Sequence, residues 1–186
     1  MNIRGNVIWI TRTAAMTALL VAVQFVTGLL GNQIVTGSAV NLLLVVTILT
    51  CGLASGATVA VISPMCAYLV GVGPMFPLLI PFIALGNVAL VIVWFVLGSL
   101  NKAGKFGKLH VAASWLTVAA AAVVKFLVLY SGVVLLAVPY LLKLNETQNT
   151  KLISMFSYPQ LVTATIGGAV ALAAVTPIKK AIKSRV

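Results

Sequence analysis

The number of membrane crossings in this chain depends on one apolar stretch, Ala39–Gly71, which reads AVNLLLVVTILTCGLASGATVAVISPMCAYLVG. Its 33 residues are too many for one straight spanning helix, which needs roughly 20, and slightly too few for two such helices. Gly52, Ser55 and Gly56 lie near its middle, where glycine and serine are typical of a tight turn. We therefore predict two short spans here, at residues 39–53 and 56–71.

The distribution of basic residues supports this division. Four further apolar runs lie at residues 8–30, 78–100, 111–139 and 158–177, giving six spans. With the N-terminus inside, nine basic residues are cytoplasmic: Arg4, Arg12, Lys102, Lys105, Lys108, Lys179, Lys180, Lys183 and Arg185. Only Lys143 and Lys151 are outside, whereas five spans give at best seven against four. Because cytoplasmic segments carry the excess of Lys and Arg, the sequence predicts six spans with cytoplasmic N- and C-termini.

The composition agrees with this fold and excludes several functions. With 62% hydrophobic residues, 7% charged residues and a mean hydropathy of +1.19, the chain cannot cover a water-facing surface. We expect an all-α integral membrane protein, a compact bundle of six transmembrane helices forming one domain over residues 1–186. The net charge of +11 then reports topology in the lipid bilayer, and no nucleic acid partner is expected.

The chain has a single acidic residue, Glu146, which the span assignment places in a polar outer loop. Catalysis by paired carboxylates needs a second acid, and calcium or magnesium sites need carboxylate ligands. Cys51 and Cys66 lie in apolar runs without the spacing of a metal site. We therefore expect no catalytic residues, no metal site and no enzymatic activity.

Lys125 is the sharpest candidate for a site residue, because it lies deep within the fifth predicted span. At 1.5 Å per residue it is about 22 Å from the inner end of that span. No acid in the membrane can pair with it, so its partners should be backbone carbonyls, water or a bound anion. Two interpretations stay open: Lys125 contacts a ligand with a carboxylate, phosphate or exposed carbonyl, or it is structural.

Side-chain amides gather in the same outer half of the predicted bundle, at Gln24, Asn41, Asn87 and Gln160. Asn87 should lie at a depth comparable with that of Lys125. Amides in hydrocarbon form bonds between helices, but such a cluster also suits a small polar ligand.

Three predicted outer loops, at residues 31–38, 71–77 and 140–157, could close over this ligand. Phe76 in the second loop could cap an apolar or aromatic ligand, and Tyr130 lies toward the same side. We include both aromatic residues among the candidate binding residues. Short connections of this kind also occur in any compact bundle, so the loops alone do not decide the function.

Ala14, Ala18 and Ala22 recur every four residues along the first span and form one smooth face. Small residues at this spacing allow another helix to approach closely. This helix is either a neighbour in the same bundle or part of a separate protein.

Taken together, the length, the six spans and the Ala-x-x-x-Ala pattern at Ala14, Ala18 and Ala22 resemble the substrate-binding S components of energy-coupling factor (ECF) transporters. These transporters take up vitamins across the prokaryotic cell membrane. The resemblance implies high-affinity binding of a vitamin or related micronutrient near the outer face. It also implies docking of the alanine face on a membrane-embedded scaffold subunit, the T component, which is joined to two ATPase subunits.

The resemblance further implies that this chain holds no cofactor, since the partner subunits hydrolyse ATP. It does not identify the vitamin. Two other functions stay open on the residues alone: a stand-alone channel or facilitator, which needs no energy source, and a structural subunit of another membrane complex.

Overall fold

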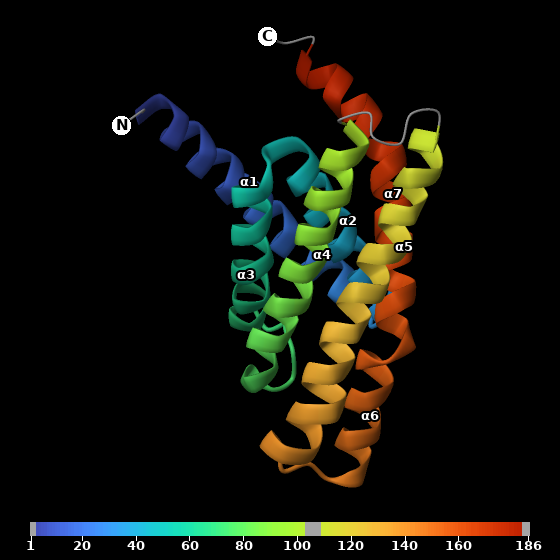
Figure 1. Ribbon diagram of the computed structural model, residues 1–186. Coiled ribbons are helices and arrows are strands. Elements are labelled where there is room, and N and C mark those ends of the chain that lie inside the picture. The colour runs from blue at the N-terminus through green and yellow to red at the C-terminus, as the bar shows by residue number, and fades with distance from the viewer. Residues whose placement is uncertain (1–2, 103–108, 184–186) are drawn as a thin grey trace.

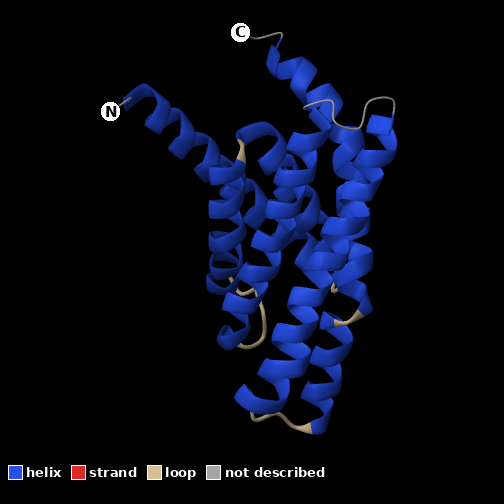
Figure 2. Ribbon diagram, in the orientation of Figure 1, coloured by secondary structure: helices blue, strands red, loops and turns tan. Residues whose placement is uncertain are grey.

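The computed structural model describes residues 3–102 and 109–183, and the described chain consists of helices joined by short loops, without strands (Figure 2). Its elements are α1 (Ile3–Gly28), α2 (Gln33–Cys51), α3 (Leu53–Leu69), η1 (Pro77–Leu79), α4 (Ile80–Lys102), α5 (His110–Leu129), η3 (Tyr130–Leu141), α6 (Glu146–Phe156) and α7 (Tyr158–Lys183).

The stretch Ala39–Gly71 is divided into two helices at Gly52, in agreement with the predicted division, but Ser55 and Gly56 lie within α3 and not in the turn. Gly52 has a φ of 88°, and its N–H donates to the Ile48 carbonyl at the end of α2. Residues with a side chain rarely adopt this left-handed backbone conformation, whereas glycine does so without steric cost. The glycine therefore ends α2 and lets α3 start at the next residue.

Within the described residues, five helical segments are long and apolar enough to cross a membrane: Gly5–Gly28, Gln33–Cys51, Pro77–Asn101, His110–Leu141 and Glu146–Val175. A sixth apolar helix, α3, has 17 residues. The predicted all-helical fold is thus confirmed, and the five to six apolar helices are compatible with the predicted membrane bundle. The cytoplasmic orientation of the termini stays a prediction.

The second helix begins earlier than the apolar pattern predicts, at Gln33 instead of residue 39. The side-chain oxygen of Asn32 accepts hydrogen bonds from the backbone N–H groups of Ile34 at 2.9 Å and Val35 at 3.4 Å. This is an N-cap, which satisfies the free N–H groups of the first helical turn. Most of the predicted outer loop at residues 31–38 is therefore helix.

The predicted outer loop at residues 140–157 also contains a helix, α6. Asn145 and Gln148 form a reciprocal capping box at its start. The preceding span continues beyond residue 139, because η3 is a π-helix that extends α5 to Leu141. The helix α6 packs against η3, and buried Leu152 and Phe156 form part of the apolar cluster between them.

Both ends of the described chain lie at one end of the bundle, and the α3–α4 and η3–α6 connections lie at the opposite end (Figure 1). The central helix α2 packs against α7, α1 and α3, and α4 packs against α3 and α5. Of the basic residues that predict the orientation, Lys105, Lys108 and Arg185 lie outside the described residues.

Candidate functional site

A cavity of about 580 Å³ lies between the helices beside the α1–α2 and α3–α4 connections. Every described helix except η3 contributes to its lining, together with the α1–α2 and α3–α4 connections. Its volume falls within the range of small-molecule sites, about 300–1,000 Å³. The bundle therefore contains a space suited to a small ligand.

Lys125 forms the centre of a buried polar network in this cavity. Its Nζ donates hydrogen bonds to Asn41 Oδ1 at 2.6 Å and to Asn87 Oδ1 at 2.7 Å. Only 4% of the Lys125 surface, 1% of Asn41 and 2% of Asn87 are exposed. These hydrogen bonds thus link three helices, α5, α2 and α4, through residues that are far apart in sequence. The sequence prediction of backbone carbonyls, water or an anion as partners missed these two side-chain amides.

The position of Asn41 depends on close packing between α2 and α7. A Cβ atom on Gly167 would lie 2.6 Å from the Ser38 carbonyl oxygen and 2.7 Å from the Asn41 Cβ, so only glycine fits there. Asn41 Nδ2 also donates to Thr163 Oγ1 at 3.3 Å. Asn41 is therefore fixed by α7 on one side and directs its oxygen at Lys125.

The position of Asn87 depends on a second close approach, between α4 and α5. A Cβ atom on the preceding residue, Gly86, would lie 2.7 Å from Leu129 Cγ. This contact holds α4 against the helical turn that follows Lys125. Asn87 Nδ2 forms no hydrogen bond within the described part of the chain.

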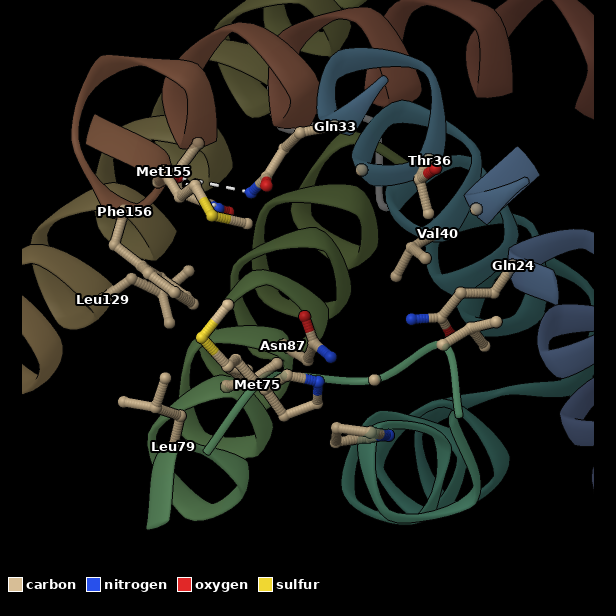
Figure 3. Close-up of a pocket in the computed structure, with 18 of the residues that line it drawn as sticks. Gln24, Gln33, Thr36, Val40, Met75, Leu79, Asn87, Leu129, Met155 and Phe156 are labelled. Atoms are coloured by element: carbon tan, nitrogen blue, oxygen red, sulfur yellow. Dashed lines mark hydrogen bonds between the residues drawn. The ribbon is translucent and has the colours of Figure 1, made fainter. Parts of the chain in front are cut away.

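The cavity has two chemically different sides, which Figure 3 shows on either side of Asn87. Leu79, Leu129 and Phe156 line one side, and Gln24 and Thr36 line the other. Gln24 Oε1 is buried and lacks a hydrogen-bond partner among the described residues. The site can therefore hold a molecule with an apolar body and separate polar groups.

The amides of Gln33 and Gln160 meet where α6 ends and α7 begins. Both donate to the Met155 carbonyl, at 3.4 Å and 3.0 Å respectively (Figure 3 for Gln33). This carbonyl belongs to the last turn of α6, where no helical N–H is available. The two glutamines therefore connect the cavity end of α2 and the start of α7 to α6.

Five of the seven binding residues predicted from the sequence line the cavity: Gln24, Asn41, Asn87, Lys125 and Gln160. The other two do not. Phe76 packs with the apolar cluster around Leu79, and the Tyr130 ring lies 5.5 Å from the Phe126 ring. Both aromatic side chains thus pack elsewhere in the protein.

Sequence reasoning missed Thr163 and the wall contributed by α6. The Asn145–Gln148 capping box, followed by Leu152, Met155 and Phe156 at helical spacing, was the signal for that wall. No comparable signal marks Thr163, because its role depends on the approach of α7 to α2.

The alanine face of α1 lies on the outside of the bundle. Ala14, Ala18 and Ala22 are all exposed, so they do not pack against another helix of this chain. Ala14 and Ala18 line a shallow apolar groove of about 510 Å³ between α1 and α3, together with Thr58 and Ile62 from α3. Behind it, Thr13 Oγ1 is hydrogen-bonded at 2.8 Å to buried Ser55 Oγ and joins the two helices.

Among the described residues, no group of three or more His, Cys, Asp or Glu side chains is placed to hold a metal ion. The acidic residue Glu146 begins α6 and does not line the cavity. The site thus offers an ammonium group, amides and apolar side chains, a set suited to binding a molecule.

Comparison with known proteins agrees with this geometry. The family model described as "ECF transporter, substrate-specific component" matches residues 12–179, which include the alanine face and the residues of the Lys125 network. Searches of curated proteins and of solved structures each gave no significant match. Since the family model covers most of the chain and confirms the resemblance found in the sequence, this protein belongs to the family of ECF transporter substrate-specific components.

Proposed function

We propose that this protein binds a vitamin or related micronutrient with high affinity in the cavity around Lys125 and delivers it inward when docked on an ATP-driven module. The observation that carries the proposal is the cavity between the helices with a buried ammonium group and two amides. Its size fits a small organic molecule.

Membership of the family sets the frame for this proposal. The chain is a multi-pass membrane protein and a substrate-binding subunit of a transporter, not an enzyme. It works with a T component and an ATPase module on a small-molecule substrate. We propose that the ATPase module comprises two subunits that hydrolyse ATP, so that this chain holds no cofactor.

Two unsatisfied groups support binding in the cavity. Gln24 Oε1 is a buried acceptor without a partner among the described residues, and Asn87 Nδ2 is a donor without one. A buried polar group without a hydrogen bond costs about 1–3 kcal/mol. A ligand that donates to Gln24 Oε1 recovers this free energy, and it can also accept a hydrogen bond from Asn87 Nδ2.

The exposed face at Ala14, Ala18 and Ala22 supports docking on the T component. It is apolar, smooth and adjoins the groove between α1 and α3. Small side chains allow the helix backbones of two proteins to approach closely. The alternative that this face packs within the bundle does not agree with its exposure.

Transport by the reconstituted complex tests both parts of the proposal. We expect Ala14→Trp and Ala18→Trp to abolish co-purification with the T component and ATP-dependent uptake, while the isolated chain retains its ligand. Ala15→Trp is the matched control, because Ala15 is also exposed on α1 but does not line the groove. Normal uptake by both groove variants would contradict the docking face. Solute flux through the isolated chain without ATP would instead indicate a facilitator.

A further inference from the structure

Building on the proposed function, we infer that the substrate carries a single carboxylate, which lies against Lys125 and Asn87 while an apolar body lies against Leu79, Leu129 and Phe156. The argument rests on the charge of the cavity, its free hydrogen-bond donors and its apolar wall.

The first observation is the charge balance around Lys125. Its ammonium group is buried and contacts two uncharged amide oxygens. No Asp or Glu lies among the described residues that line the cavity. Charged side chains within a membrane bundle generally pair with an opposite charge or with backbone carbonyls. We therefore expect the substrate to supply the negative charge that balances the Lys125 ammonium group.

The second observation is the number of donors that remain. An ammonium group has three N–H donors, and Asn41 and Asn87 accept two of them. Asn87 Nδ2 is also free of partners within the described chain, whereas Asn41 Nδ2 is bound to Thr163. One free N–H on Lys125 and one on Asn87 match the two oxygens of a carboxylate.

These numbers favour a carboxylate over a phosphate. A phosphate ester carries a charge of about −1.5 to −2 and three strong acceptor oxygens. One buried cation and two adjacent donors satisfy only part of that charge and that acceptor set. Lys151, the other basic residue of the lining, is exposed and therefore stays hydrated.

The third observation is the composition of the opposite wall. Leu79, Leu129 and Leu152 are almost fully buried, and they lie with Phe156 in one apolar cluster on one side of the cavity (Figure 3 for Leu79, Leu129 and Phe156). An apolar wall contributes affinity through the apolar surface of the ligand that it removes from water. Across the cavity, the unpaired Gln24 Oε1 accepts a hydrogen bond from a hydroxyl or N–H group of the same molecule.

Acids paired with uncharged counterparts test the inference on the purified chain in lipid nanodiscs. The probes are nicotinate and nicotinamide, biotin and its primary amide, lipoate and lipoamide, and pantothenate and panthenol. Thermal unfolding and calorimetric titration measure binding, and inorganic phosphate is a separate arm. We expect at least one acid to bind about tenfold or more tightly than its counterpart, the effect of one charge-assisted hydrogen bond.

Three variants identify the residue responsible for this preference. Lys125→Met should remove the difference between acid and counterpart. Lys143→Met is the matched control, since it removes the same type of side chain from an exposed position outside the cavity lining, and it should retain the difference. The triple variant Lys125→Met, Asn41→Leu, Asn87→Leu replaces the whole network with apolar groups and keeps the test valid if Lys125→Met fails to fold.

The outcomes distinguish the inference from the proposed function. The inference of a carboxylate is overturned if no acid binds more tightly than its uncharged counterpart. It is also overturned if phosphate stabilises the wild type as much as the best acid does, or if the triple variant retains the preference for acids. Uptake of an uncharged compound by the full complex would then leave the proposed function intact. If acids bind the isolated chain with the expected preference but the full complex transports none of them with ATP, the proposed function fails and the binding chemistry stands.

Discussion

Replacing Gly167 with alanine should destabilise the protein by separating α2 from α7. The new Cβ atom would lie 2.6 Å from the Ser38 carbonyl oxygen and 2.7 Å from the Leu42 backbone nitrogen. Both are backbone atoms of α2, so rotation of a side chain cannot relieve the contact. Ordinary van der Waals distances are about 3.5 Å, so the helices must move apart by roughly 0.9 Å.

This displacement has a calculable effect on the Lys125 network. Moving Asn41 by the same amount would lengthen its 2.6 Å bond to Lys125 beyond about 3.2 Å, the usual limit of a good hydrogen bond. Overpacking costs about 1–3 kcal/mol, and a hydrogen bond to a charged group contributes about 1.5–3 kcal/mol. The higher helix propensity of alanine offsets roughly 1 kcal/mol of this. We expect a net loss of about 2–4 kcal/mol.

Thermal unfolding in one detergent, followed by tryptophan fluorescence, measures the change. At about 2–4 °C per kcal/mol for a chain of this size, Tm should fall by about 4–16 °C. Gly98→Ala is the matched control, because a Cβ there has no atom within 4 Å and α4 should become slightly more stable. A Gly167→Ala protein that unfolds at or above the wild-type Tm would refute the close-packing argument.

Three further substitutions test separate parts of the structure. Asn87→Asp places a carboxylate at the 2.7 Å contact with Lys125, so we expect the protein without ligand to have a Tm several degrees higher. Calorimetry should then show at least about tenfold weaker binding of acidic probes, and unchanged binding of these probes would contradict the expectation. Thr13→Val removes the buried hydrogen bond to Ser55 and should cost about 1–2 kcal/mol in thermal unfolding, with part of the loss restored by adding Ser55→Ala. Asn145→Ala removes the N-cap of α6 and should weaken that helix by about 1 kcal/mol, seen as faster amide hydrogen exchange in α6 than in α4.

The apolar pattern and the turn chemistry were sufficient to predict most of the bundle. Hydropathy gave the long spans, and Gly52 marked the division between α2 and α3. The pattern failed at helix ends, because Asn32 and Asn145 start helices through side-chain caps in polar segments that hydropathy does not register. Hydropathy alone therefore describes α2 as too short and α6 as a loop.

In the candidate site too, local sequence patterns predict some contacts, whereas contacts that depend on the packing of distant helices are missed. Depth along each span placed Asn87 level with Lys125, and the structure joins them. The contact with Asn41 depends on how closely α7 approaches α2 at Gly167, and no local pattern reports that distance. Phe76 lies in the predicted loop between α3 and α4, but its ring packs in the apolar cluster around Leu79 and not against the cavity.

The scarcity of acids has a physical consequence for how ligand binding and stability are linked. The ammonium group of Lys125 is held by neutral amides, so its charge is solvated by dipoles but not balanced by a counter-charge. An anion that binds only the folded protein stabilises it by an amount that grows with ligand concentration over Kd. An aspartate at position 41 or 87 would stabilise the empty protein instead and remove this dependence. Neutral amides around a buried lysine therefore leave the site incomplete until a substrate of opposite charge is bound.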